Sequence, residues 1–212
     1  MARPQKISDA DILSTMRAAV IEHGPLVSLD LVAEQLGVTA PALLKRFGTR
    51  QNLFLKALQP DEEGLKRVFA EPLTDDRLVI QLGQLIGRLS DHFRAALPCA
   101  IALRSCGLSE EFCDKKPLLL PAVDGATRWL ENMRDRGLIN QSSSPSTTGT
   151  AIVGAVTTRL LAAYLRRKPW PPTSQARYAK ELAELFARAL ESSSSSVKRR
   201  PSKKRSGKGK TA

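Results

Sequence analysis

The sequence predicts an all-α protein. Apolar residues recur at helical spacing along most of the 212 residues, β-branched runs are few, and no hairpin dipeptide joins alternating segments. Hydrophobic residues form 42% of the chain, enough for a real core in one or two domains. We expect an N-terminal helical head at residues 1–58, a helical body at 61–191 and a disordered tail at 192–212.

The head contains a short helix that ends in a tight turn. Ser28 is placed to cap this helix, because its hydroxyl can accept from a free backbone N–H. Gly37 can adopt the positive φ that a sharp helix end needs, and Val38 can then point back into the core. The apolar face of the helix consists of Leu29, Val32, Ala33 and Leu36.

A second short helix follows this turn. Thr39 is placed to cap it, and Pro41 falls in its first turn, where no intrahelical N–H is required. Leu43 and Phe47 share one face at i and i+4. The outward face is small and basic, comprising Ala40, Pro41, Ala42, Lys45 and Arg46. This pattern is a helix-turn-helix signature and predicts sequence-specific DNA binding.

The stretch from about residue 7 to residue 58 resembles the DNA-binding domain of TetR-family transcriptional regulators. The resemblance rests on the pairs Ile12-Leu13, Ala18-Ala19, His23-Gly24 and Val32-Ala33, the turn Gly37-Val38-Thr39, and Leu43, Phe47, Thr49-Arg50 and Leu53. It covers roughly the first quarter of the chain. Leu44 stands where the family usually has Tyr, and Arg50 where it usually has Lys. Leucine lacks a hydroxyl that commonly reaches a phosphate.

The expected DNA contacts divide between backbone and bases. The resemblance implies that Ser28, Thr49 and Arg50 contact the DNA backbone. Lys45 is the candidate donor to guanine, and Pro41 and Ala42 can touch thymine methyls. The complete predicted set is Ser28, Thr39, Ala40, Pro41, Ala42, Leu44, Lys45, Thr49 and Arg50, with Arg3 and Lys6 on an N-terminal arm.

Prolines and glycines divide the body into predicted helices. These are 61–70, 75–97 ended by Pro98, 118–136 ended by Gly137, 148–167 halted by Pro169, and 173–191. The resemblance implies that this body binds a small-molecule effector and that its last two helices pair with those of a second subunit. Independently, residues 148–167 are apolar on nearly every side, as in a helix buried within and between subunits. The central helix of a monomer would show the same pattern.

The last helix carries one apolar stripe. Its members are Tyr178, Leu182, Leu185, Phe186 and Ala189. We predict a homodimer through 148–167 and 173–191, which would let two recognition helices read a palindrome with half-sites about one helical turn apart.

Two polar residues are candidates for the effector site. His92 lies at the edge of an apolar helix face, where it can hydrogen-bond a ligand or serve as a structural histidine. Arg159 falls on the same side as several apolar residues, so it should pair with a carboxylate of the protein or of an acidic effector.

Catalysis and metal binding have little support. The chain has two His residues and no HExxH, phosphate-binding Gly-rich loop or nucleophile elbow, so we expect no enzyme. Cys99, Cys106 and Cys113 are spaced by seven without a CxxC pair. Buried inert thiols are favoured over a redox sensor, and we expect no metal or cofactor.

Charge is concentrated at the C-terminus. Eight of the 33 Lys and Arg follow Ser192, where no acidic residue occurs, so the rest of the chain has 25 basic and 21 acidic residues. This tail is either a solvated segment or a source of sequence-independent DNA affinity. An alternative function is a helical adaptor whose tail binds nucleic acid or anionic membrane.

The location expected from the sequence is cytoplasmic. The N-terminal residues lack the uninterrupted apolar core of a secretory signal. The apolar stretch 151–165 contains Arg159 and is too short to span a bilayer, so we expect no membrane partner.

Overall fold

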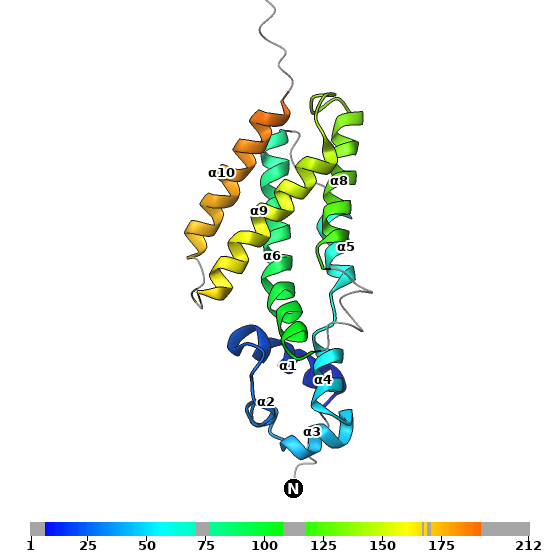
Figure 1. Cartoon of the computed structure of the whole chain (residues 1–212), viewed down its shortest axis with the longest axis vertical. Helices are drawn as coiled ribbons and strands as arrows, with labels where there is room; N and C mark the ends of the chain where they lie inside the picture. Colours follow the sequence, from blue (N-terminus) through cyan, green and yellow to red (C-terminus); the bar gives the residue numbers. More distant parts are fainter. Residues whose placement is uncertain (1–6, 71–76, 108–117, 167, 169–170, 192–212) are drawn as a thin grey trace, which may run out of the picture.

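The computed structural model describes residues 7–70, 77–107, 118–166, 168 and 171–191. In these ranges the chain forms helices and connecting turns without a strand, so the predicted all-α class is confirmed (Figure 1). The helices are α1 (Asp9–His23), α2 (Leu29–Gln35), α3 (Ala40–Phe47), α4 (Arg50–Ala57), α5 (Glu62–Ala70), α6 (Leu78–Ser105), α8 (Leu120–Asp135), α9 (Pro145–Leu165) and α10 (Pro172–Leu190).

The head is built from α1 to α4 and lies at one end of the long axis (Figure 1). Local side chains start several of its helices. Ser8 and Asp11 form a reciprocal capping box on α1, and these hydrogen bonds lower the pKa of the Asp11 carboxyl. Gly37 adopts φ +65°, and Val38 packs against the head core, as predicted. The core side chains from the four helices include Ile12, Met16, Val32, Leu43, Phe47, Leu53 and Phe54.

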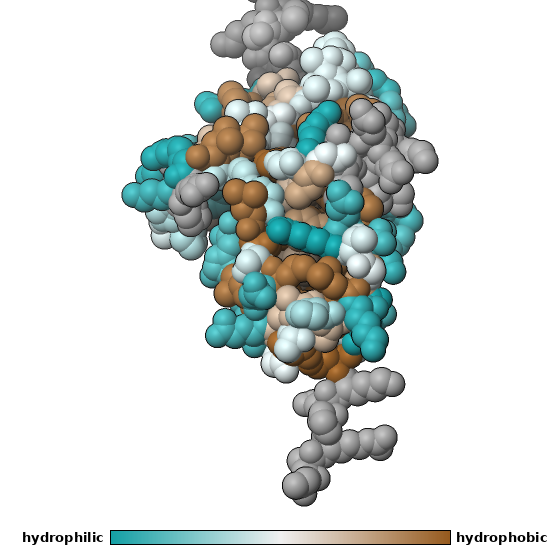
Figure 2. Space-filling view, turned by 60° about the horizontal axis from the view of Figure 1, so that its bottom comes forward, coloured by the Kyte–Doolittle hydropathy of each residue, from teal (hydrophilic) through white to brown (hydrophobic). Residues whose placement is uncertain are grey.

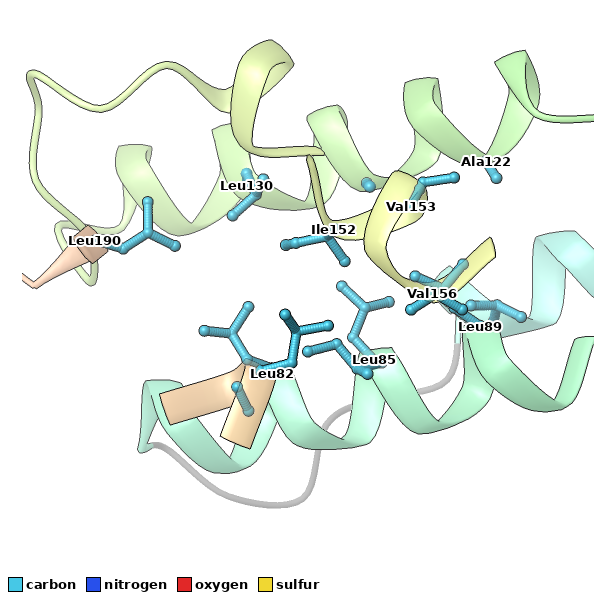
Figure 3. Close-up of a cluster of buried hydrophobic side chains, with 14 of the residues drawn as sticks. Leu82, Leu85, Leu89, Ala122, Leu130, Ile152, Val153, Val156 and Leu190 are labelled. Carbon is cyan, nitrogen blue, oxygen red and sulfur yellow. The ribbon is translucent and has the colours of Figure 1, made fainter. Parts of the chain in front are cut away.

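The body surrounds a second apolar cluster between α6, α8, α9 and α10. The close-up in Figure 3 shows Leu82, Leu85 and Leu89 of α6 facing Ile152, Val153 and Val156 of α9, with Leu130 of α8 and Leu190 of α10 nearby. The inward face of α6 consists of Leu82, Leu85, Ile86, Leu89 and Phe93, which are all buried. Gly137 has φ +72° just after the C-cap residue Arg136 of α8, a position where glycine commonly ends a helix.

Helix α6 does not end at Pro98, so the predicted boundary at residue 97 is wrong. The helix continues to Ser105 with Pro98 buried inside it. An internal proline removes one hydrogen bond and costs about 3 kcal/mol. Burial of Cys99, Ala102 and Leu103 in the head core offsets this cost. One helix therefore belongs to both hydrophobic clusters and connects head to body (Figure 1).

The apolar faces of the last two helices differ from the prediction. On α10 the buried residues are Leu182, Ala183, Ala187 and Leu190. Leu185 and Ala189 are exposed, so the predicted stripe divides between the core and the surface. The buried face of α10 differs from the predicted stripe because α10 packs principally against α6.

Helix α9 is longer than the apolar stretch 151–165 from which we predicted that no segment spans a membrane. It has 21 residues, so by length and composition it could cross a membrane. The length of α9 therefore does not exclude a membrane span, contrary to the prediction made from residues 151–165. Central helices of packed bundles meet the same criterion, and α9 packs against α6 and α8.

Candidate nucleic-acid interface

Helix α3 presents its predicted outer face to solvent. Leu43 and Phe47 are buried in the head core and fix the orientation of the helix. Pro41, Ala42 and Lys45 are exposed on the opposite side. Figure 2 brings this end of the molecule forward, and it shows apolar surface interspersed with hydrophilic side chains. This mixture suits a groove that offers both methyl groups and hydrogen-bond acceptors.

The start of α3 differs in one detail from the prediction. Thr39 occupies the N-cap position, but its side chain makes no capping hydrogen bond. Pro41, at the second helical position, has no N–H, and the N–H of Ala42 donates to the Thr39 backbone carbonyl at 3.0 Å. The exposed Thr39 hydroxyl is consequently not used in starting the helix.

Two predicted contact residues are only partly accessible. Ala40 is half-buried and packs against the head core, and Leu44 is half-buried on the same helix. Their contribution to an outer surface is smaller than that of Pro41, Ala42 and Lys45. Of the predicted contact residues on α3 itself, only Pro41, Ala42 and Lys45 are therefore exposed.

Ser28 and Thr49 cap the two helices that flank α3. The Ser28 hydroxyl oxygen accepts from the Leu31 N–H at 3.2 Å, and the Thr49 hydroxyl oxygen accepts from the Asn52 N–H at 3.1 Å. Both residues are exposed, and each hydroxyl keeps its own hydrogen for donation. Capping and a phosphate contact are therefore compatible at both positions.

Arg50 has partners inside the head. Its guanidinium donates to the Val27 carbonyl at 2.7 Å and lies 4.9 Å from the centre of the Phe54 ring. These contacts hold the turn between α1 and α2 against α4. Arg50 thus has a structural role that the resemblance did not predict.

Arg46 ties α3 to the start of α1. It donates to the Ile7 carbonyl at 2.6 Å and pairs with Asp9. Sequence reasoning placed Arg46 on the free outward face and missed this pair. Asp9 lies 37 positions before Arg46, so no local sequence pattern indicates that the two side chains pair.

The two effector candidates do not share a site. His92 lines a cleft between α1, α5 and α6. Burial holds the pKa of the His92 imidazole below its ordinary value, and the ring packs edge-on against Phe93 at 5.4 Å. Arg159 lies instead between α9 and α10, where it donates to Ser174 and Gln175 and stacks 4.2 Å from the Tyr178 ring centre.

Several predicted features lie outside the described residues: Arg3, Lys6, Cys113 and the tail at 192–212. Cys99 is buried, and burial raises the pKa of its thiol. Cys106 is half-buried at the end of α6. In the described ranges no group of three His, Cys, Asp or Glu residues is arranged to hold a metal ion.

Solved structures of transcriptional regulators share this architecture. A TetR transcriptional regulator from Streptomyces coelicolor matches with a TM-score of 0.56 at 20% identity, covering 88% of this chain and 99% of that one. The chain has the fold of TetR-family regulators. A TetR-family regulator from Pectobacterium atrosepticum matches with a TM-score of 0.55 at 21% identity, covering 86% and 93% of the two chains.

A further match to the TetR-type fold is SmeT, the repressor of the multidrug efflux pump SmeDEF of Stenotrophomonas maltophilia. Its TM-score is 0.58 at 18% identity, over 89% of this chain and 93% of SmeT. No family model and no curated protein matches the sequence. The predicted arrangement of a helix-turn-helix head and a helical body is confirmed.

Proposed function

We propose that this protein is a sequence-specific DNA-binding transcriptional regulator that acts as a homodimer in the cytoplasm. The observation that carries the proposal is the exposed turn of α3. Pro41, Ala42 and Lys45 face solvent on a helix whose opposite side is locked by Leu43 and Phe47. A rigid helix with one cation and two small apolar groups suits the major groove, where Lys45 donates to guanine and the apolar groups touch thymine methyls.

Exposed leucines on the last two helices support a dimer. Leu161 is 38% and Leu165 70% exposed on α9, and Leu185 is 56% exposed on α10. Large apolar side chains on adjacent helices favour burial against a second copy. Twofold symmetry would present two α3 helices to one face of a duplex.

Release of the DNA by a small-molecule effector completes the proposal. SmeT, a repressor of the same fold, supports repression as the sign of regulation. An effector that binds the released arrangement better than the DNA-bound one would shift the population toward release. We expect no enzymatic activity, since the proposed role needs only binding.

Selection of bound duplexes from random DNA tests the function. We expect enrichment of a palindrome with half-sites about one helical turn apart, together with a dimer in sedimentation at the same protein concentration. Equal retention of all sequences would contradict the proposal.

The same experiment separates the alternative, a helical adaptor that binds through its basic tail. A variant ending at Glu191 should keep its sequence preference if α3 reads the bases. An adaptor would show no preference in the full chain and would lose binding with the tail.

A further inference from the structure

An open cleft of about 670 Å³ lies where the head meets the body. Its volume is within the range typical of small-molecule sites. Arg17 of α1 contributes the wall from the head, and the remaining wall comes from α5, α6 and Asp61 just before α5. The lining residues include Arg17, Asp61, Arg67, Arg88, Asp91 and His92.

The two carboxylates of the cleft already have partners. Asp61 accepts from the Gly64 N–H at 2.8 Å, and its other oxygen lies 3.8 Å from Arg67. Asp91 pairs with Arg94 at 3.0 Å, and Arg94 is not among the residues lining the cleft. Asp91 is thus compensated by a cation from outside the cleft. The pair between Asp61 and Arg67 is long, and the Arg67 guanidinium keeps N–H donors for a further acceptor.

Arg17 is held differently. Its guanidinium donates to the backbone carbonyls of Ala57 at 3.3 Å and of Gln59 at 2.8 Å. Carbonyl oxygens carry no net charge, so these bonds orient the guanidinium without neutralising it. A guanidinium has five N–H donors and matches a carboxylate in a two-bond geometry.

The cleft also offers apolar surface next to these charges. Val68, Ala95 and Ala96 line it beside His92, whose ring is half-buried. A ligand that combines a negative charge with a compact apolar body would pair with the cations and also cover the apolar side chains of the cleft. A purely inorganic anion would leave the apolar wall uncovered.

We propose that this junction cleft binds a small organic carboxylate, with its charge at Arg17 and Arg67 and its apolar body against Val68, Ala95 and Ala96. Arg17 donates to Ala57 and Gln59 through Nη1 alone, and hydrogen bonds to a carboxylate are stronger than those to a carbonyl, so a carboxylate that uses Nη1 in its two-bond contact competes with both carbonyls. Binding therefore loosens the contact of α1 with the end of α4. This regulatory consequence rests on the proposed function, whereas the binding itself does not.

Methyl NMR of the full chain tests the binding step, with benzoate as the probe and neutral benzamide of similar shape as its control, at constant ionic strength. We expect benzoate to shift the methyl signals of Val68, Ala95 and Ala96, and benzamide to leave them in place. Equal shifts with both compounds, or no benzoate shift in the cleft, would overturn the proposal.

Variants of exposed residues identify the groups that hold the charge. Arg67→Gln should weaken benzoate binding at least fivefold, while Arg128→Gln on exposed α8 surface should leave it unchanged. Asp91→Asn removes a negative charge from the wall and should tighten binding, a gain that misfolding cannot mimic. Unchanged affinity in both cleft variants would contradict the assignment.

The coupling step is measured separately, with a duplex taken from the selection. Benzoate should lower duplex affinity in the parent chain and less so in Arg67→Gln. Methyl shifts in the cleft without a change in duplex affinity would overturn the coupling through Arg17. If the chain selected no duplex, the proposed function would fail, and the methyl shifts would still show whether the cleft binds the carboxylate.

Discussion

The head and the body reach a fixed structure by different means. In the head, α2, α3 and α4 have only seven or eight residues each, lengths at which isolated helices are marginal. Caps at Ser28 and Thr49 and arginine bonds to backbone carbonyls supplement a small core. In the body, α6 reaches 28 residues and apolar packing dominates. The surface proposed to read DNA therefore depends on polar bonds that single substitutions can remove.

The largest expected effect is the loss of a large side chain from the body core. Phe93 is fully buried on α6, so Phe93→Ala should lower the free energy of unfolding by about 3–5 kcal/mol. Urea denaturation measures this change. Leu26→Ala is the control, since Leu26 is 90% exposed and its loss should cost less than about 0.5 kcal/mol. Similar costs at both positions would show that apolar packing does not hold the body.

Close approach of α8 and α9 predicts the next effect. A Cβ at Gly149 would lie 3.0 Å from the Thr127 backbone nitrogen, so Gly149→Ala should destabilise by about 1–3 kcal/mol through overpacking. A Cβ at Gly87 of α6 would meet nothing within 4 Å, and Gly87→Ala should stabilise by about 0.5–1 kcal/mol. Thermal unfolding of both variants checks the opposite signs. Stabilisation by Gly149→Ala would contradict the packing.

The caps of the head predict a smaller difference. Thr49 accepts a capping hydrogen bond, whereas Thr39 at the equivalent position of α3 makes none. Thr49→Ala should therefore cost about 1 kcal/mol, and Thr39→Ala distinctly less. Denaturant titrations of the two variants give the comparison. Equal losses would mean that the Thr39 hydroxyl stabilises the helix after all.

The smallest effect is a dependence on pH at the junction of the two regions. Burial lowers the pKa of His92 from its ordinary value of 6.5, so below that pH the unfolded chain binds a proton that the folded chain resists. The free energy of unfolding should accordingly fall as pH drops from about 6.5 toward the lower, folded pKa. His92→Gln should reduce this fall, as unfolding at pH 7.5 and 5.5 would show. An identical pH dependence in both chains would exclude the effect.

Features that depend on neighbouring residues could be predicted from the sequence, whereas features that depend on distant contacts could not. The Ser28 cap, the Gly37 turn and the inward Leu43 and Phe47 depend on neighbours within a few residues, so the local pattern predicted them. The course of α6 could not be predicted locally, because the cost of Pro98 is offset by packing against a head that precedes it by many residues. The partners of Arg17 and Arg50 lie 40 and 23 residues away. Most of the polar bonds that position the surface proposed to bind DNA could therefore not be predicted from the sequence.

The central claim is that α3 reads base pairs, and Lys45 tests it most directly. Affinities for a selected duplex and for single-base-pair variants of it should be measured with the parent chain, Lys45→Ala and Lys180→Ala, whose lysine is exposed on α10. We predict that Lys45→Ala loses about 1–3 kcal/mol of discrimination at one position in each half-site and that Lys180→Ala loses none. Unaltered discrimination in Lys45→Ala at every position would contradict the account.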